Sequence, residues 1–258
     1  MSRLLLEDSH PGIPALHVIV NDRSTGAAEA RNQALKRAEG DFVAFLDDDD
    51  IWSPEFLQLQ VANLDRHPSA LVSYAEYLEV YRDGRRRRPD LLPLFEYETP
   101  LVHLLTESYI HTLSIIVCRR RAFALAGYLD SELRVVHDLD WYARLLVSGG
   151  EIIHLSGNPL VLREMPGGLI AGHRLWFDEE SKVIARICHR DSLCAGSEKG
   201  IRTHRSLLFA KIGISRGDYS FTLARLFEAM GKAPFRSLRI VLERLRRSLS
   251  ARDKGEVG

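Results

Sequence analysis

The chain has 258 residues, 45% of them hydrophobic, and its 35 Lys and Arg balance 35 Asp and Glu. This length and apolar content predict a globular protein with a substantial core, and the zero net charge provides no basic field that would favour nucleic acid as a partner. The sequence has no apolar run long enough to span a bilayer and no recognisable secretory signal, so we expect a cytoplasmic protein.

The cysteines are odd in number and scattered, at Cys118, Cys188 and Cys194. This usage is more typical of a reducing compartment than of a disulfide framework. Cys188 and Cys194, with His189 between them, lack a second pair of ligands, which argues against a zinc site. We therefore expect reduced cysteines.

The first part of the chain predicts a strand, a helix and a second strand. Residues 16–20 are rich in β-branched side chains, and alanines recur at helical spacing over residues 26–39, where Gly40 can end the helix. The apolar stretch FVAFL (42–46) then predicts a buried strand. This order predicts an α/β fold with a parallel sheet and a site at the carboxyl ends of its strands.

Four consecutive aspartates, Asp47 to Asp50, follow that strand directly. Adjacent carboxylates repel one another and need a positive charge nearby. In an extended segment, Asp47 and Asp49 would leave the same face and could share one divalent cation. An EF-hand loop is excluded, because Trp52 stands where that loop needs glycine and Gln58 where it needs glutamate.

An acidic loop that only caps the next helix is the alternative interpretation of the aspartates. However, Ser53, Pro54 and Glu55 already provide an N-cap, a first helical position and a first-turn acid. A helix cap therefore does not account for all four aspartates.

Further strands are predicted at 70–81, 113–118, 151–155 and 159–163, and helices at 54–65 and 119–126. A run of four arginines (85–88) is most simply a solvated turn, with contact to phosphate or an anionic membrane as the alternative. His173, in a later loop, is more simply a surface residue than a metal ligand.

The stretch VVHDLDWYARLL (135–146) predicts a helix that begins at Asp138. Asp140 and Arg144 have the spacing of an ion pair along one helix face. A purely structural interpretation is complete, with Asp138 as an N-terminal charge, Trp141 in the core and Arg144 in a salt bridge. From these residues alone we favour that interpretation over a catalytic one.

From about residue 175 the pattern changes to helices without strands, so we predict one domain over 1–174 and a helical C-terminal extension over 175–258. Residues 237–250 form a basic amphipathic pattern. Its apolar stripe consists of Leu238, Val241, Leu242, Leu245 and Leu249, and its arginines are Arg236, Arg239, Arg244, Arg246 and Arg247. Such a helix can lie on an anionic membrane, and packing on the same chain or on a partner is at least as well supported.

Together, these segments resemble the family 2 glycosyltransferases, the GT-A group that uses nucleotide-activated sugars. Residues 26–57 (GAAEARNQALKRAEGDFVAFLDDDDIWSPEFL) are similar to the family's Ala-Arg-Asn helix, glycine stop, strand and Asp-x-Asp site. Residues 125–164 resemble its glycine-aromatic turn, acceptor-side acidic motif, Trp/Arg helix and closing strands. The resemblance covers roughly residues 4–172 and implies a Rossmann-like GT-A fold, a mixed sheet flanked by helices.

The resemblance implies an inverting transfer of a sugar from a nucleoside-diphosphate donor to an acceptor hydroxyl. Asp49 and Asp47 are implied ligands of Mg²⁺ or Mn²⁺, which would stabilise the charge of the leaving diphosphate. Asp47, Asp48 and Arg31 are implied donor contacts. Asp138 falls at the family's catalytic base, which takes the proton of the acceptor hydroxyl.

Around that base, the resemblance also assigns supporting residues. His137 stands where the family usually carries glutamate, a change that could alter the local charge and the response to pH. Trp141 and Arg144 are implied to form walls on the acceptor side or to support the base.

The front of the chain departs from the family pattern. Family members begin with a strand, a helix and a strand that hold the nucleotide base, whereas about fifteen residues precede Leu16. We interpret residues 16–26 as the third strand and its turn, which predicts that the first three elements are absent and that an open sheet edge promotes association. A catalytically silent GT-A domain that acts as a binding or assembly module is therefore the alternative. A metal-dependent nucleotidyltransferase or phosphatase is weaker, because it lacks a second acidic cluster.

The implied partners are a nucleotide-sugar donor and a glycan, lipid-linked or small-molecule acceptor in cell-envelope polysaccharide synthesis. Peripheral membrane contact through residues 237–250, at the inner face of the membrane, and a homo-oligomer are further expectations.

Overall fold

The computed structural model describes residues 3–7, 16–81, 84–89, 96–157, 161–165 and 172–233. The strands are β1 (Arg3–Glu7), β2 (Leu16–Val20), β3 (Phe42–Ala44), β4 (Asp50–Trp52), β5 (Ala70–Ala75), β6 (Tyr77–Tyr81), β7 (Arg86–Arg87), β8 (Ile116–Arg119), β9 (Glu151–Leu155) and β10 (Val161–Met165). The helices are α1 (Ala27–Leu35), α2 (Phe56–Arg66), α3 (Pro100–Glu107), the 3-10 turn η1 (Leu113–Ile115), α4 (Arg121–Ala126), α5 (His137–Val147), α6 (His173–Arg190), α7 (Ser192–Ser215) and α8 (Tyr219–Lys232).

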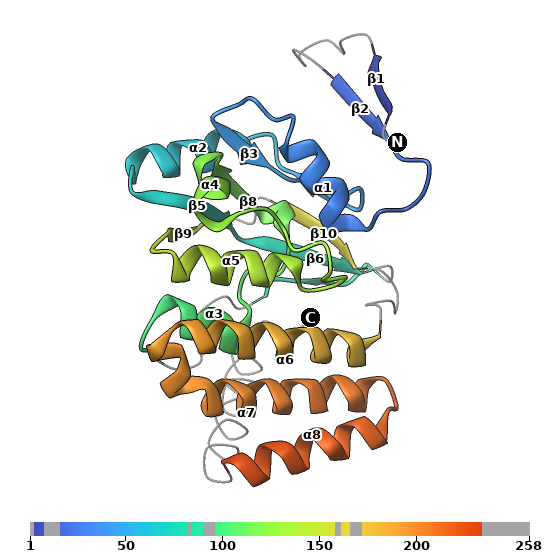
Figure 1. Cartoon of the computed structure of the whole chain (residues 1–258). Coiled ribbons are helices and arrows are strands. Elements are labelled where there is room, and N and C mark those ends of the chain that lie inside the picture. The colour runs from blue at the N-terminus through green and yellow to red at the C-terminus, as the bar shows by residue number, and fades with distance from the viewer. Residues whose placement is uncertain are drawn as a thin grey trace.

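A mixed four-stranded sheet in the order β3, β8, β5, β9 forms the centre of the α/β region (Figure 1). β8 runs antiparallel to β3 and β5, so these two strands are parallel to each other, and β5 is also parallel to β9. Every residue of β5 is buried, as expected for a strand inside a sheet with helices packed on it. The predicted α/β fold with a mixed sheet flanked by helices is confirmed.

A second sheet has the order β4, β10, β6, β7. β10 pairs antiparallel with β4 and parallel with β6. Arg86 and Arg87, from the predicted solvated turn, form β7 and pair antiparallel with β6. Arg88 forms an ion pair with Glu76. The arginine run is therefore partly a strand at the edge of this sheet.

The hairpin β1–β2 stands apart from both sheets (Figure 1). β2 was interpreted as a strand of the main sheet, and that interpretation is wrong: within the described residues, β2 pairs only with β1, from Leu16 opposite Glu7 to Val20 opposite Arg3. Two β-rich stretches close in sequence satisfy each other's backbone groups in this way. β3 pairs only with β8 among the described strands and so forms an edge of the main sheet.

One apolar core runs from the main sheet into the C-terminal helices. Val72, Ile116 and Trp141 belong to it, and so do Ile184 of α6 and Ile201 of α7, all at 1% exposure or less. A smaller cluster joins α6, α7 and α8 through Phe177, Phe209 and Phe221. The predicted boundary between a domain over 1–174 and an extension over 175–258 thus falls between elements that share one core.

Helices α6, α7 and α8 lie side by side beyond α5 (Figure 1), as the predicted helical extension requires. α8 buries Thr222 and Ala229 and exposes large apolar side chains. The exposed set on α8 consists of Tyr219, Leu223, Leu226, Phe227 and Met230. Within the described residues, no helix combines the length and apolar character that crossing a membrane requires. The amphipathic segment 237–250 lies outside the described residues.

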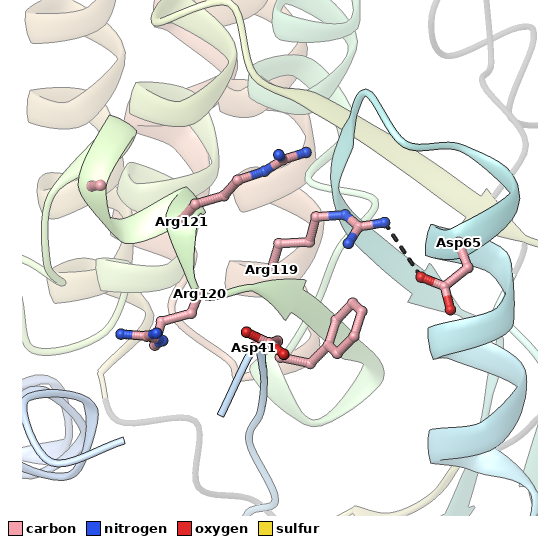
Figure 2. Close-up of a pocket in the computed structure, with 7 residues that line it drawn as sticks. Asp41, Asp65, Arg119, Arg120 and Arg121 are labelled. Carbon is pink, nitrogen blue, oxygen red and sulfur yellow. Dashed lines mark ion pairs between the residues drawn. The ribbon is translucent and has the colours of Figure 1, made fainter. Parts of the chain in front are cut away.

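A hollow of about 540 Å³ lies at the amino end of β3, beside Arg119, Arg120 and Arg121 (Figure 2). Arg119 forms an ion pair with Asp65 at 3.5 Å. Each arginine also donates to a backbone carbonyl, at 2.9 Å to Leu64, 2.8 Å to Gly40 and 2.7 Å to Pro68, respectively. Arg119 thus binds the last turn of α2, and Arg120 and Arg121 bind the loops before β3 and β5. The hollow lies at the amino end of β3, whereas the aspartates follow its carboxyl end.

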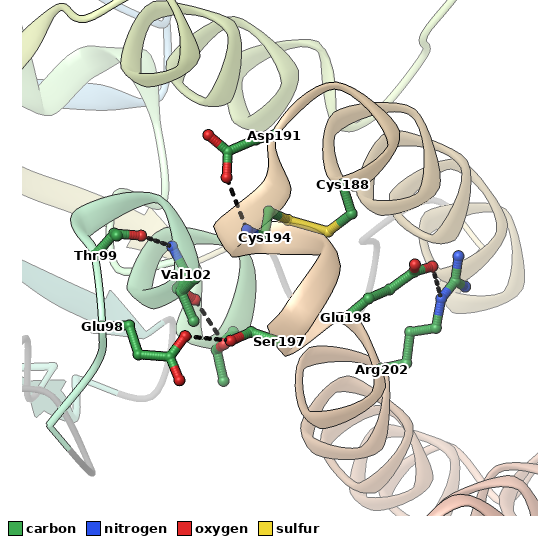
Figure 3. Close-up of a disulfide and its surroundings, with 10 residues drawn as sticks. Glu98, Thr99, Val102, Cys188, Asp191, Cys194, Ser197, Glu198 and Arg202 are labelled. Atoms are coloured by element: carbon green, nitrogen blue, oxygen red, sulfur yellow. Dashed lines mark hydrogen bonds and ion pairs between the residues drawn. A yellow bond between two sulfur atoms is a disulfide. The ribbon is translucent and has the colours of Figure 1, made fainter.

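The expectation of reduced cysteines is wrong for one pair, because Cys188 and Cys194 form a disulfide between α6 and α7 (Figure 3). Asp191 caps α7 by accepting a hydrogen bond from the Cys194 backbone N–H at 2.7 Å, and this turn brings the two Cα atoms to 4.7 Å. Cys118 is a buried free thiol in β8, and burial raises its pKa. The cysteine argument for a reducing compartment therefore loses its support.

Candidate functional site

The acidic cluster follows β3 in a turn. The backbone N–H of Asp50 donates to the carbonyl of Asp47 at 3.2 Å, and β4 begins at Asp50. Carboxylate oxygens of Asp47, Asp49 and Asp50 lie within 4.8 Å of one another. The expected extended alternation does not occur: the turn itself brings Asp47 and Asp49 together, and it adds Asp50. Asp48 is exposed in the same turn.

Turn η1 holds the two ends of the acidic turn. The backbone N–H of Asp47 donates to the Ser114 hydroxyl at 3.0 Å, and the Trp52 indole donates to the Ser114 carbonyl at 2.7 Å. The Thr112 hydroxyl lies 3.4 Å from the Asp47 carboxylate. Sequence reasoning missed Thr112 and Ser114, whose only signal was two hydroxyl residues at the start of a predicted buried strand.

Arg31 links the acidic turn to the start of α5. Its Nη2 donates to the Asp47 carboxylate, and its Nη1 lies 2.8 Å from Nε2 of His137. Because a guanidinium only donates, Nε2 of His137 is the acceptor. The neighbouring Asn32 fixes α1 through two hydrogen bonds to the backbone of Leu129, at 2.8 and 3.0 Å. The two residues of the predicted Arg-Asn motif therefore have different roles. Arg31 lies at the site, and the buried Asn32 holds α1 against Leu129.

His137 and Asp138 open α5. Burial lowers the pKa of His137, and the Asp138 carboxylate opposes this. Burial raises the pKa of Asp138, while His137 and Arg31 oppose that rise. An oxygen of Asp138 accepts from the backbone N–H of Leu139 at 2.7 Å. A carboxylate with a raised pKa is a stronger base than an ordinary aspartate, as proton abstraction requires.

Trp141 and Arg144 pack behind the start of α5. Trp141 is fully buried, donates to the Gly127 carbonyl at 2.9 Å and stacks on Phe123. Arg144 donates to Asp140 at 2.8 Å and to the Tyr128 carbonyl at 2.8 Å. Both side chains fix α5 against the turn after α4, which is a supporting position.

His173 stands apart from the acidic turn. Its Nε2 lies 3.0 Å from the Asp218 carboxylate, and its ring contacts Phe221 edge to face. These contacts tie the start of α6 to the start of α8. With a side chain that is only 12% exposed, His173 is a packed, paired residue rather than the simple surface residue that was expected.

The acidic turn fits a hard divalent cation. Mg²⁺ and Mn²⁺ prefer oxygen ligands, and the turn presents three carboxylates whose oxygens are close enough to share one ion. Arg31 binds Asp47 from the side of α1, which leaves Asp49 at the exposed face of the cluster. Sequence reasoning selected Asp47 and Asp49 and missed Asp50, because an extended segment would have turned Asp50 away.

Comparisons with known proteins agree with this architecture. Residues 2–125 match the model of glycosyl transferase family 2. The chain is 28% identical over 145 residues to an uncharacterized glycosyltransferase of Haemophilus influenzae, which covers 56% of this chain and 48% of that protein. It is 49% identical over 47 residues to the UDP-Glc:alpha-D-GlcNAc-diphosphoundecaprenol beta-1,3-glucosyltransferase WfgD of Escherichia coli, which covers 18% of this chain and 19% of that protein.

Among solved structures, the crystal structure of Staphylococcus aureus TarS 1-349 in complex with UDP-GlcNAc superposes with a TM-score of 0.54 at 22% identity. The match covers 86% of this chain and 66% of that chain. The chain spans about half the length or less of the first curated relatives that it matches. The fold is therefore that of a GT-A glycosyltransferase. The match of residues 2–125 to glycosyl transferase family 2, together with the similarity to curated glycosyltransferases, confirms the resemblance found in the motifs.

Proposed function

We propose that the chain transfers a sugar from a nucleoside-diphosphate donor to an acceptor hydroxyl, with inversion and with the help of a divalent cation. The observation that carries this proposal is the meeting of three segments at Arg31. Its guanidinium joins the acidic turn at Asp47 to the start of α5 at His137, next to Asp138. A cluster suited to a cation and a carboxylate suited to be a base are thereby held in one place.

Asp47 and Asp49 would hold the cation, with Asp50 as a further carboxylate. When bound, Mg²⁺ or Mn²⁺ would supply positive charge for the leaving diphosphate. Arg31 places a fixed positive charge at the same turn, and its pairing with Asp47 keeps that charge oriented. Asp48, exposed beside them, remains a predicted donor contact.

Asp138 would remove the proton of the acceptor hydroxyl as that oxygen attacks the anomeric carbon. A single displacement of this kind inverts the configuration of the sugar. His137 is buried beside Asp138, and its lowered pKa keeps the ring neutral, so that Nε2 can accept from Arg31. We assign His137 to the orientation of Arg31, and Trp141 and Arg144 to the support of α5.

The names of similar proteins support the partner classes. The TarS structure was determined with UDP-GlcNAc, and WfgD is named for a UDP-Glc donor and a diphosphoundecaprenol-linked acceptor. We therefore propose a nucleotide-sugar donor and a glycan or lipid-linked acceptor of a cell-envelope polysaccharide. Action in the cytoplasm at the inner face of the membrane, with contact through residues 237–250, is part of the same proposal.

The donor half is tested by thermal unfolding with UDP, GDP, dTDP and CDP, each with and without Mn²⁺. A ligand at a hundred times its Kd, bound only to the folded chain, adds about 2.7 kcal/mol of stability. We expect one nucleotide to raise Tm only with Mn²⁺, and Asp49→Asn to abolish the shift. Asp178→Asn, which neutralises an exposed acid on α6, is the matched control and should keep it.

The transfer half is tested with the nucleotide sugar that this panel identifies. Asp138→Asn should keep the metal-dependent Tm shift and lose sugar transfer. Transfer that survives this substitution would contradict the role of Asp138. A chain that binds no nucleotide and transfers no sugar would instead favour the catalytically silent module.

A further inference from the structure

The start of α5 lacks a capping side chain of its own. Val136 occupies the N-cap position and makes no side-chain capping hydrogen bond. The first N–H groups of a helix have no partner within it, so a buried helix start needs an acceptor from elsewhere. Just before α5, the backbone N–H groups of residues 134–136 find their acceptor in Glu179, which lies more than 40 residues further along the chain, on α6.

The Glu179 carboxylate receives backbone N–H groups from three consecutive residues. One oxygen accepts from Arg134 at 2.9 Å, and the other accepts from Arg134 at 3.1 Å, Val135 at 2.9 Å and Val136 at 3.3 Å. Glu179 is 5% exposed. Hydrogen bonds to a buried charged acceptor are stronger than those between neutral groups. The backbone just before His137 and Asp138 is therefore fixed by one carboxylate.

A second residue on the same face of α6 also contacts α5. Arg186, two turns after Glu179, donates to Asp140 at 2.6 Å and to Asp130 at 3.0 Å. Asp140 is fully buried in the first turn of α5. The two contacts have opposite polarity, since Glu179 accepts from the backbone before α5 and Arg186 donates to a side chain within it. Together they fix both the entry and the first turn of α5.

α6 is itself held in place by contacts with α7 and α3. Glu180, next to Glu179, forms a buried ion pair with Arg205 of α7. Arg205 also lies 3.4 Å from the carbonyl of Thr106 in α3. The position of Glu179 is therefore tied to α7 and α3 as well as to its own helix.

We propose that Glu179 is a positioning residue for the proposed transfer reaction, holding residues 134–136 so that Asp138 faces the acceptor hydroxyl. This inference rests on the proposed function. Asp138 stands two residues after Val136, and its own short contact is to the N–H of Leu139, so its place follows the backbone that Glu179 holds. α6, which like α5 lies beyond the family match at residues 2–125, thereby acquires a positioning role for the proposed base.

The test compares Glu179→Gln and Glu179→Ala in the full chain. Glutamine keeps one acceptor oxygen and replaces the other with a donor, whereas alanine removes both. A misplacement of about 1 Å at a catalytic group costs about a hundredfold in rate. We expect kcat to fall about tenfold in Glu179→Gln and about a hundredfold in Glu179→Ala. The donor KM should stay within about twofold of the original chain, because the hydrogen bonds removed are those to residues 134–136, whereas the ion pair of Arg31 with Asp47 remains.

Two control variants separate positioning from general loss of stability. Phe177→Leu loosens the small cluster between α6, α7 and α8, whose members do not include a residue of α5. Asp178→Asn neutralises the exposed acid next to Glu179. We expect both to keep kcat at temperatures well below their Tm. Amide hydrogen exchange should be faster at Arg134, Val135 and Val136 in Glu179→Ala than in either control.

The outcomes distinguish this inference from the proposed function. If transfer depends on Asp138 while Glu179→Ala leaves kcat unchanged, the inference alone is overturned. If Phe177→Leu lowers kcat as much as Glu179→Ala does, Glu179 is a structural residue only and the inference is again overturned. A chain whose original form transfers no sugar overturns both. Loss of kcat in Glu179→Ala with unchanged nucleotide binding, faster exchange at residues 134–136 and intact controls supports it.

Discussion

The acidic turn and the helices α6–α8 use charge in opposite ways. In the turn, three carboxylates gather within 4.8 Å, and Arg31 forms an ion pair with one of them. Between α6 and α7, Glu180 and Arg205 are buried at 1% and 2% side-chain exposure and are matched one to one. In a matched buried pair each charge compensates the other, whereas a partly exposed group with excess negative charge has oxygen atoms that can bind a cation. Both regions are rich in charged side chains. They differ in that negative charge is in excess at the candidate site, whereas the charges between α6 and α7 cancel.

The largest effect is expected at Asp138, the predicted base at the start of α5. Asp138→Asn should lower the rate of sugar transfer about 10²- to 10⁴-fold, the usual contribution of a general base. Initial rates at saturating donor measure this, and Glu132→Gln, an exposed acid in the preceding loop, is the control. A loss below fivefold would mean that the site has another base.

The next effect concerns stability in the helices. Removing one partner of a buried ion pair costs about 3–5 kcal/mol, because the other charge stays buried. We therefore expect Glu180→Leu and Arg205→Met each to lower the free energy of unfolding by that amount. The double variant should lose less than the sum, as a urea denaturation cycle would show. If the losses of the two single variants simply added, Glu180 and Arg205 would not be energetically coupled. The contrast between a matched pair in the helices and excess charge in the acidic turn would then be wrong.

Arg31 offers a test of the turn itself. Arg31→Met removes the ion pair to Asp47 and the contact to His137 while keeping an unbranched side chain. Hydrogen bonds to charged groups contribute about 1.5–3 kcal/mol, so donor affinity should fall about 10- to 100-fold. Titration of the nucleotide with Mn²⁺ measures this. Arg37→Met, at an exposed position after α1, should leave the affinity unchanged.

A smaller effect is expected from α3, which contacts both α5 and α7. Burial lowers the pKa of His103 from 6.5 to about 4. The unfolded chain therefore binds more protons between these values, and stability should fall as pH decreases from 6.5 to about 4. Tm measured across this window tests the sign. In His103→Phe, which keeps a ring between Tyr97 and Tyr109, the fall should be shallower. If Tm fell equally steeply with pH in His103→Phe, the pH dependence would come from other titratable groups.

Most of what the sequence predicted correctly is local. The helix with Arg31, the strand from Phe42 and the aspartates follow one another within about thirty residues, and each has a pattern of its own. Helical spacing also predicted that Trp141 is buried and that Arg144 forms an ion pair with Asp140. Such features need only short-range periodicity and turn chemistry.

What the sequence did not predict depends on contacts between distant segments. Arg31 and His137 are 106 residues apart, and Glu179 caps a loop more than 40 residues before it. The disulfide between Cys188 and Cys194 is local, with a sequence separation of 6, but it depends on the turn at Asp191 between α6 and α7, which was not predicted from the sequence. Even the acidic run has a distant contact, because the Asp47 N–H donates to Ser114, 67 residues away, in addition to the hydrogen bond between Asp50 and Asp47 within the turn. These are tertiary constraints, and a single sequence does not encode them in any local period.

The exposed apolar face of α8 has a practical consequence for the unfolding experiments. Tyr219, Leu223, Phe227 and Met230 follow one another along the same side of the helix, and each is more than half exposed. Dyes that fluoresce on apolar surfaces should already bind there in the folded chain and mask the start of unfolding. Indole emission avoids this, because Trp141 is fully buried beside Phe123 and Trp52 and Trp176 are packed against the core, so that all three rings change surroundings when the core is lost.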